Sequence, residues 1–150
     1  MFKKAVVGGT FDQLHAGHKR ILAMAFDIAD SVVIGLTSNE FANRFRSLQA
    51  QPYDQRKKTV DAYAKELKKP YEIIEISDSY GVATIDPKID CIVVSEETLL
   101  RAEEINAIRF KKGISKISIL VIPILLASDG GAISSERIIK KEINSEGRKL

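Results

Sequence analysis

The sequence predicts an α/β fold, a doubly wound parallel sheet of five strands in a single domain that spans residues 1–150. Short apolar runs rich in β-branched residues alternate with segments whose apolar residues recur at helical spacing. Most of these runs are apolar throughout, as expected for parallel strands that are covered on both faces. No repeat or Pro- and Ser-rich linker divides the chain. Right-handed crossovers then place helices on both faces, and we expect the first strand at the centre.

The first half of the chain is expected to form three strands and two helices. Residues 5–7 and 32–36 are short, wholly or largely apolar runs, and 71–76 is a third β-rich run. Residues 17–29 and 54–69 carry apolar side chains three and four positions apart, which is typical of amphipathic helices.

The second half continues the alternation with two strands and two helices. Residues 91–94 and 117–122 are apolar strand segments. Residues 96–110 have a helical apolar pattern, and 134–143 are expected to form a last, more polar helix. In this architecture ligands bind beyond the carboxyl ends of the strands, so the segments that follow the strands are the candidates for function.

Composition excludes several classes of protein. A hydrophobic fraction of 45% and a charged fraction of 29% are ordinary for a globular domain and argue against disorder. The single cysteine, Cys91, excludes an intrachain disulfide, and the start of the chain does not have the pattern of a signal peptide. The longest apolar stretch, 119–127, contains Pro123 and is too short to span a bilayer. We therefore expect a cytoplasmic protein without a membrane partner.

The charge distribution bears on the partners. The net charge of +3 arises in residues 137–150, which contain five basic and two acidic residues. No basic stripe with interleaved aromatic residues is present, so a nucleic-acid partner is not expected. No long exposed apolar helix face is evident in the pattern, and a monomer is favoured.

The segment GGTFDQLHAGH, residues 8–18, follows the first strand and leads into a helix. Thr10 offers a hydroxyl, and Asp12 can accept hydrogen bonds or hold a metal through water. His15 and His18 are three residues apart and project from one face of the helix start. The unpaired N–H groups of a helix N-terminus favour anions, so the segment predicts a phosphate site.

Three glycines of this segment, Gly8, Gly9 and Gly17, let the backbone approach a ligand closely and keep the helix entrance open. A zinc site is the alternative use of an HxxH pair. Zinc sites need three or four protein ligands, and the chain has two histidines and a distant cysteine. No metal site built from protein ligands is therefore expected.

GTFDQLHAGH resembles the T/HxGH signature of the nucleotidyltransferase superfamily, whose members have a Rossmann-like sheet and transfer a nucleotidyl group from an NTP to a phosphate or carboxylate. Residues 80–98, YGVATIDPKIDCIVVSEET, are similar to the archaeal and eukaryotic type of phosphopantetheine adenylyltransferase. Asn106 and Arg109 form a familiar IN..R pattern, and ISSERI, residues 133–138, resembles the element that closes over the triphosphate. The resemblance runs from Val6 to about Asn144.

The resemblance implies that ATP and 4′-phosphopantetheine react to give 3′-dephospho-CoA and pyrophosphate, with Mg²⁺ on the triphosphate. Thr10 would position the attacking phosphate, and His18 would donate to the α-phosphate. His15, Ser134 and Ser135 would bind the β- and γ-phosphates, helped by backbone N–H groups of the last helix. The further residues expected at the nucleotide are Gly8, Gly9, Phe11, Asp12, Gly17, Arg109 and Arg137.

Two departures from the family pattern affect how we expect the triphosphate to be bound. Relatives usually have a lysine after the second strand, whereas this chain offers Arg44 and Arg46. We expect one of them to be catalytic and the other to be a surface residue. In the closing motif, Glu136 stands at the usual threonine position and Ile139 at the usual arginine position, with Arg137 nearby.

Two other functions stay open. Cytidylyltransferases share the first motif but usually close with an arginine- and threonine-rich element that is missing here. A catalytically weak nucleotide-binding module is the second alternative, favoured by the missing lysine and Glu136. The residues of a pantetheine pocket have no short signature and are not predicted.

Overall fold

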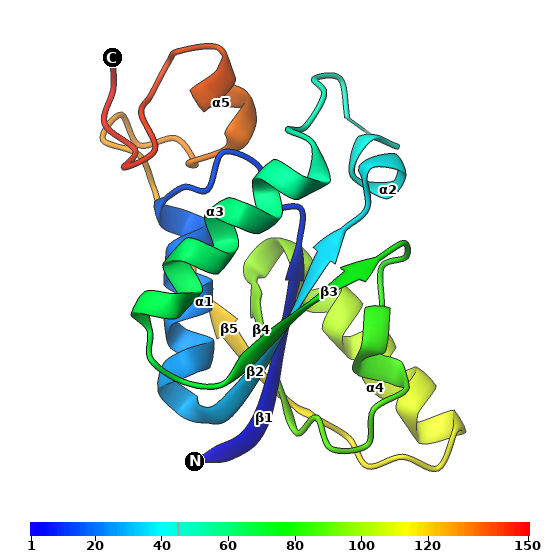
Figure 1. Cartoon of the computed structure of the whole chain (residues 1–150). Helices are drawn as coiled ribbons and strands as arrows, with labels where there is room; N and C mark the ends of the chain where they lie inside the picture. The colour runs from blue at the N-terminus through cyan, green and yellow to red at the C-terminus, as the bar shows by residue number, and fades with distance from the viewer. Residues whose placement is uncertain (45) are drawn as a thin grey trace.

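The computed structural model describes residues 1–44 and 46–150 and has one five-stranded sheet in the order β3-β2-β1-β4-β5 (Figure 1). All paired strands run parallel. The strands are β1 Phe2–Gly9, β2 Ala29–Thr37, β3 Tyr71–Ile76, β4 Cys91–Ser95 and β5 Ser118–Ile122. The expected parallel sheet is confirmed, with all five strands and with β1 at its centre.

The helices also follow the expected order. They are α1 Ala16–Ile28, α2 Asn39–Asn43, α3 Tyr53–Glu66, α4 Leu99–Lys111 and α5 Ser135–Ile139, with the 3₁₀ turns η1 Gly81–Thr84 and η2 Glu96–Thr98. The expectation of a last helix over 134–143 is too long. Helix α5 ends at Ile139, and Lys141 adopts the left-handed conformation with φ of 61°, which does not continue a helix. The short elements α2 and η1 were not predicted, because four or five residues show no periodicity.

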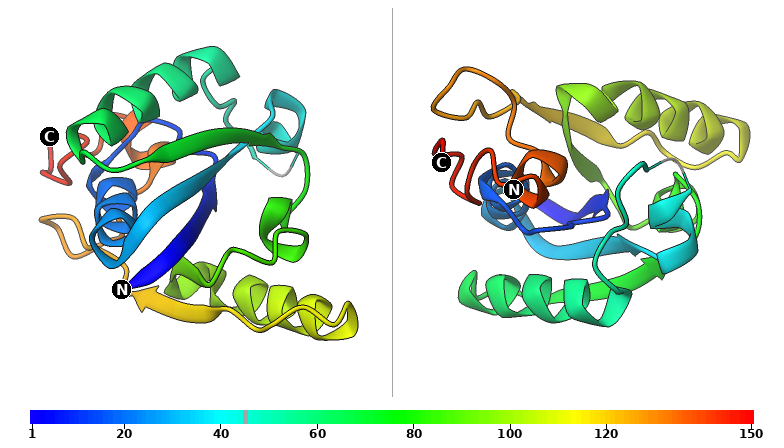
Figure 2. Two further views of the ribbon diagram at one scale, coloured as in Figure 1. Left: turned by 60° about the horizontal axis from the view of Figure 1, so that its bottom comes forward. Right: turned by 90° about the horizontal axis from the view of Figure 1, so that it is seen from above.

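Two hydrophobic layers cover the two faces of the sheet. On one face, Val7 of β1 packs in a cluster with Leu22 of α1 and Val60 of α3. On the other face, Val6 packs in a cluster with Ala83 of η1 and Ile105 of α4. Figure 2 shows α3 and α4 on opposite sides of the sheet. Neighbouring strand residues point to opposite faces, and both faces are covered by helices. The strand sequences are therefore apolar throughout.

After β5 the chain returns to the beginning of α1. Ile143 is 1% exposed and packs with Ala127 and Ile133 in a small cluster that also contacts Ala16. The N–H of Ala16 donates to the carbonyl of Ser145 at 2.9 Å. Helix α5 and the chain end therefore lie at the edge where β1 ends (Figure 1).

No helix in the two described ranges combines the length and the hydropathy that crossing a membrane requires.

Candidate active site

A cleft of about 530 Å³ opens beyond the carboxyl ends of β1 and β4. Its walls come from the beginnings of α1 and α4, from residues 122–125 and from residues 132–135. Nine of the predicted site residues line this cleft: Gly8, Gly9, Thr10, Phe11, His15, Gly17, His18, Ser134 and Ser135. The fold thus brings the first motif and the closing motif together, although more than a hundred residues separate them.

Both histidine rings accept hydrogen bonds from backbone N–H groups at the start of α1, and each ring accepts one from the N–H of the other histidine. Nδ1 of His15, the N-cap residue of α1, accepts from the N–H groups of Gly17 at 3.1 Å and His18 at 3.4 Å. Nδ1 of His18 accepts in turn from the N–H of His15 at 3.2 Å. The two rings stack with their centroids 3.6 Å apart. Because each Nδ1 is an acceptor, each neutral ring carries its proton on Nε2.

The surroundings keep both rings neutral. Burial lowers the pKa of His15 to about 4, although the charge of Asp12 acts in the opposite direction. Burial lowers the pKa of His18 to about 3, and the charges of His15 and Arg46 lower it further. At pH 7 the pair therefore offers two Nε2–H donors without a positive charge.

The expectation that free backbone N–H groups at the start of α1 form an anion site is not met, because these groups already have partners within the chain. The N–H groups of Gly17 and His18 are used by His15, and the N–H of Ala16 is used by Ser145. The imidazole rings, rather than the backbone, are the donors available to a ligand. A side chain at Gly17 would place its Cβ 3.0 Å from Cε1 of His15, so the ring would have to shift to make room for it.

Thr10 is held by a buried arginine that the sequence analysis missed. Arg56 is 0% exposed, and its Nη1 donates to the carbonyl of Thr10 at 2.9 Å and to Oγ1 of Thr37 at 3.4 Å. The hydroxyl of Thr37 donates to Oγ1 of Thr10 at 3.0 Å, which leaves the Thr10 proton for a ligand. A signal was present in the sequence, because Arg56 precedes Val60 and Ala64 by four and eight residues on the buried stripe of α3.

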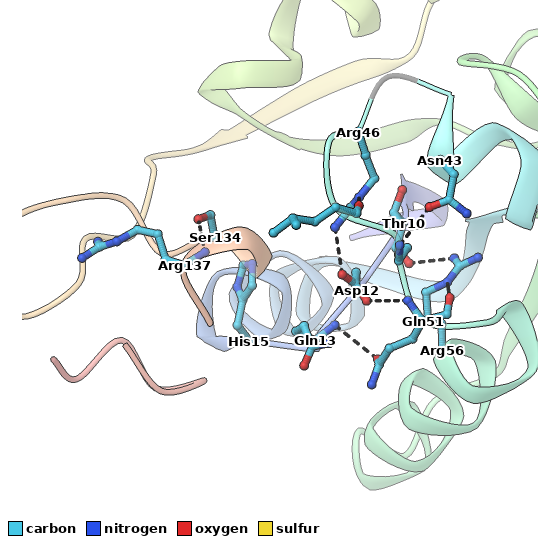
Figure 3. Close-up of polar contacts among 12 residues, drawn as sticks. Thr10, Asp12, Gln13, His15, Asn43, Arg46, Gln51, Arg56, Ser134 and Arg137 are labelled. Carbon is cyan, nitrogen blue, oxygen red and sulfur yellow. Dashed lines mark hydrogen bonds and ion pairs between the residues drawn. The ribbon is translucent and has the colours of Figure 1, made fainter. Parts of the chain in front are cut away.

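Asp12 does not line the cleft, contrary to the expectation that it contacts the nucleotide. Its side chain is 0% exposed, and its oxygens accept from Nη2 of Arg46 at 2.8 Å and from the N–H of Gln51 at 3.0 Å (Figure 3). The described residues also contain no cluster of three His, Cys, Asp or Glu side chains that could hold a metal.

The two loop arginines lie in different surroundings. Arg44 has a side chain that is 50% exposed, with Glu40 3.9 Å away, and it does not line the cleft. Arg46 points toward Asp12 and lines a second cavity of about 270 Å³ together with Ser134, Ser135 and Glu136. Glu136 pairs with Lys140 of the same helix at 3.0 Å.

The expectation that Arg109 contacts phosphate does not agree with its position. Arg109 is 1% exposed and donates to the carbonyls of Ala83, Asp86, Ile89 and Ser115 at 2.7 to 3.1 Å. It fastens the segment that contains η1 to helix α4. The IN..R pattern is therefore a structural feature in this chain, since Asn106 likewise bonds both backbone groups of Ile117.

Arg137 also turns away from the cleft, contrary to expectation. Its guanidinium pairs with Asp129 and with Glu142 and donates to the carbonyl of Ala132. In Figure 3 its side chain extends away from His15, although Ser134 lies beside the site. Arg137 thus stabilises the loop that carries the closing motif.

Comparisons with known proteins show the family and the fold. Residues 6–141 match the family model described as cytidylyltransferase-like. The phosphopantetheine adenylyltransferase of Methanopyrus kandleri is 42% identical over 139 residues, which cover 91% of this chain and 88% of the relative. The protein of the same name from Methanosarcina mazei is 42% identical over 150 residues, covering 97% of this chain and 96% of the relative.

Solved structures share the fold. A protein of unknown function from Archaeoglobus fulgidus has a TM-score of 0.68 at 32% identity, covering 87% of this chain and 99% of that one. The pantoate-beta-alanine ligase of Francisella tularensis, with a TM-score of 0.59 at 16% identity, covers 91% of this chain and 64% of the ligase and supports the fold alone. With its archaeal relatives 42% identical over nearly their full length, the chain belongs to the phosphopantetheine adenylyltransferase family of cytidylyltransferase-like proteins.

Proposed function

We propose that this protein transfers the adenylyl group of ATP to 4′-phosphopantetheine, giving 3′-dephospho-CoA and pyrophosphate in coenzyme A biosynthesis. A phosphate oxygen of the acceptor forms a bond to the α-phosphorus, and the bond to the bridging oxygen of the β-phosphate breaks. The observation that carries the proposal is the reciprocal pair His15 and His18 at the cleft. The archaeal relatives named for this activity support the choice of substrates.

The chemistry needs donors that are in place before charge develops. Negative charge grows on the α-phosphate oxygens in the transition state, and Nε2–H of His18 is oriented by its Nδ1 contact to the N–H of His15. A donor that needs no reorganisation stabilises this charge efficiently. Thr10 donates its hydroxyl proton to the attacking phosphate, and His15, Ser134 and Ser135 contact the remaining phosphates. No protein nucleophile is required.

Mg²⁺ enters this proposal as part of the substrate, in the form of the MgATP complex. It neutralises charge on the pyrophosphate that leaves. The residues present fit this form, since Asp12, the buried carboxylate within the phosphate-binding segment, is occupied by Arg46 and Gln51. The lining of the main cleft offers neutral donors together with Arg20 and Arg101, and Arg46 lines the second cavity.

A pyrophosphate-release assay with ATP and CTP, each against a panel of phosphorylated acceptors, tests the proposal. We expect turnover with ATP and 4′-phosphopantetheine, and loss of turnover when divalent cations are chelated. Preferred use of CTP would instead support cytidylyl transfer, the alternative suggested by the description of the family model. Absence of turnover with both nucleotides, combined with measurable ATP binding, would identify a nucleotide-binding module.

We further propose that the protein acts as a cytoplasmic monomer that binds no nucleic acid. The single cysteine is buried in β4 and unpaired, which suits a reducing compartment. Light scattering at micromolar concentration is expected to give the mass of one chain, 16.6 kDa. A mass twice as large would reject the monomer.

A further inference from the structure

Phe11 has a backbone conformation that bulky residues rarely adopt. Its φ of 51° lies in the left-handed region, where the Cβ atom of a side chain crowds the backbone. In the described part of the chain, three other residues besides glycine have a positive φ: Gln13, Lys68 and Lys141. Lys68 and Lys141 come directly after the C-caps of α3 and α5, where this conformation is common. Phe11 ends no helix, so its conformation has another cause.

The neighbours of Phe11 on both sides hold this turn in place. The carbonyl of Thr10 accepts from Nη1 of the buried Arg56 at 2.9 Å. The carboxylate of Asp12 accepts from the N–H of Gln51 at 3.0 Å. Both flanking residues are thus anchored to α3 and to the chain just before it. These contacts over-determine the turn, and this is the condition under which a strained conformation persists in a folded protein.

The turn places the ring of Phe11 between the hydrophobic core and His18. The ring is 4% exposed and belongs to the cluster that also contains Val7 and Leu22. It lies close to Gly9, where an added Cβ would be 3.3 Å from Cε2 of Phe11. The ring also makes a T-shaped contact with the imidazole of His18, with the centroids 5.3 Å apart and the planes at 63°. Phe11 therefore connects the packed interior with the imidazole.

The other contacts of the His18 ring come from His15. Nδ1 of His18 accepts from the N–H of His15 at 3.2 Å, and the two rings stack with their centroids 3.6 Å apart. A single hydrogen bond lets a ring turn about the axis of that bond, and a stacked neighbour limits the motion on one face. The T-shaped contact with Phe11 is a separate constraint with its own preferred geometry.

We propose that Phe11 is a positioning residue for His18, and that the left-handed turn at residue 11 brings its ring against the imidazole. The role of His18 as a donor to the α-phosphate rests on the proposed function, whereas the fixing of its ring rests on the contacts above. A misplacement of about 1 Å can cost on the order of 100-fold in rate, so a fixed ring matters for turnover. Phe11 itself transfers no proton and acts through His18.

F11G separates the side chain from the turn, because glycine adopts a φ of 51° without strain. We expect kcat to fall roughly 10-fold to 100-fold, less than the cost of removing the His18 donor outright. The Kd for ATP, measured by calorimetry, should change little. F11L keeps an apolar side chain but no flat ring, and its kcat should lie between those of F11G and the wild type. Full activity of F11G would overturn the proposal.

F26L is the matched control for F11L. Phe26 is 2% exposed, belongs to the same hydrophobic cluster and makes a T-shaped contact with Tyr71, with the centroids 5.9 Å apart. It does not line the cleft. F26L is expected to destabilise the fold about as much as F11L and to leave kcat unchanged. Equal losses of kcat in F26L and F11L would indicate a general effect of destabilisation and would overturn the proposal.

The state of the His18 ring in the free protein tests the positioning role without any turnover. Nitrogen-15 chemical shifts of the imidazole report its tautomer and its pKa. In the wild type and in F26L the ring should stay neutral, with its proton on Nε2, through the range around pH 6.5 where an ordinary histidine titrates. In F11G the pKa should rise toward 6.5, because burial is the largest cause of its lowered value. A loss of kcat in F11G with unchanged His18 signals would overturn the proposal.

The double variant F11G/H18A shows whether Phe11 acts through His18. It should turn over no more slowly than H18A alone, and additive losses would overturn the proposal. A wild-type protein without turnover whose His18 signals change in F11G but not in F26L would refute the proposed reaction and support the positioning role.

Discussion

Each histidine of the pair uses one ring nitrogen to cap the backbone and keeps the other for a ligand. Nδ1 of His15 and Nδ1 of His18 accept from backbone N–H groups at the start of α1, so both rings are oriented before any substrate arrives. Burial keeps the rings neutral. The same contacts thus set the tautomer, the charge and the direction of the donors, and their consequences can be measured one residue at a time.

Replacement of His18 by Ala is expected to lower kcat about 100-fold to 1,000-fold, the usual cost of losing one preorganised donor to a developing negative charge. The dissociation constant for ATP should change little, because this hydrogen bond strengthens mainly in the transition state. Steady-state kinetics and calorimetry measure the two quantities. If instead KM rises while kcat stays constant, His18 binds the ground state and the role proposed for it is wrong.

The pH dependence of stability follows from the same pair. The folded-state pKa values, about 4 for His15 and about 3 for His18, lie below the unfolded value of 6.5. Between pH 6.5 and pH 4 the unfolded chain therefore binds more protons, and the free energy of unfolding falls as the pH is lowered. Urea unfolding at several pH values measures this slope. The double variant H15N/H18N, which lacks both titrations, should show a shallower slope, and an equal slope would argue against neutral histidines.

At the scale of elements, two buried arginines fasten loops to helices. Arg56 projects from α3 to the carbonyl groups of Thr10 and Gln51, and Arg109 projects from α4 to the carbonyl groups around η1. Both lie on the buried side of their helix. Only Arg56 contacts the segment that we propose to bind phosphate, so the two arginines form a natural pair for comparison.

R56M and R109M are both expected to lower the free energy of unfolding by about 3 kcal/mol or more, because each removal leaves several buried carbonyl groups without donors. Only R56M should also lower kcat, since it frees the loop that carries Thr10. Chemical denaturation and steady-state kinetics at a temperature where both variants are folded measure the two effects. A folded R109M protein with impaired turnover would show that Arg109 contributes to the reaction after all.

At the scale of the whole molecule, the chain end packs against the candidate active site although it lies beyond the residues matched by the family model, 6–141. The carbonyl of Ser145 accepts from the first N–H group of α1, and Ile143 is buried against the loop of the closing motif. The tail thereby connects the helix that carries both histidines with the segment that carries Ser134 and Ser135.

Truncation after residue 142 is expected to destabilise the fold by at least about 2 kcal/mol, the lower limit for the loss of a buried isoleucine side chain. It should also lower kcat, because both halves of the phosphate site lose support. I143V, which removes one methyl group, is the milder control and should cost about 1 kcal/mol. Thermal and chemical unfolding and kinetics at saturating ATP provide the measurements. A truncated protein with unchanged stability and turnover would show that the tail has no positioning role.

The sequence by itself determined the elements and the place of the candidate site. Five apolar strand runs, the helical patterns between them and the glycines and histidines of residues 8–18 were sufficient, because hydrophobic periodicity and the geometry of parallel sheets are local and general properties. The sequence pattern did not predict short elements such as α2, because they depend on a single cap, here Ser38, rather than on periodicity.

Only the tertiary structure decided which charged side chains lie at the candidate site. Arg46, Arg109 and Arg137 look alike in the sequence, yet one faces a cavity, one fastens a loop and one pairs with acids of its own segment. The N-terminus of α1 likewise looked open to anions until the chain end supplied Ser145. An arginine is flexible and finds its partner among groups that are distant in sequence, so its role depends on contacts that form only when the sheet brings those segments together.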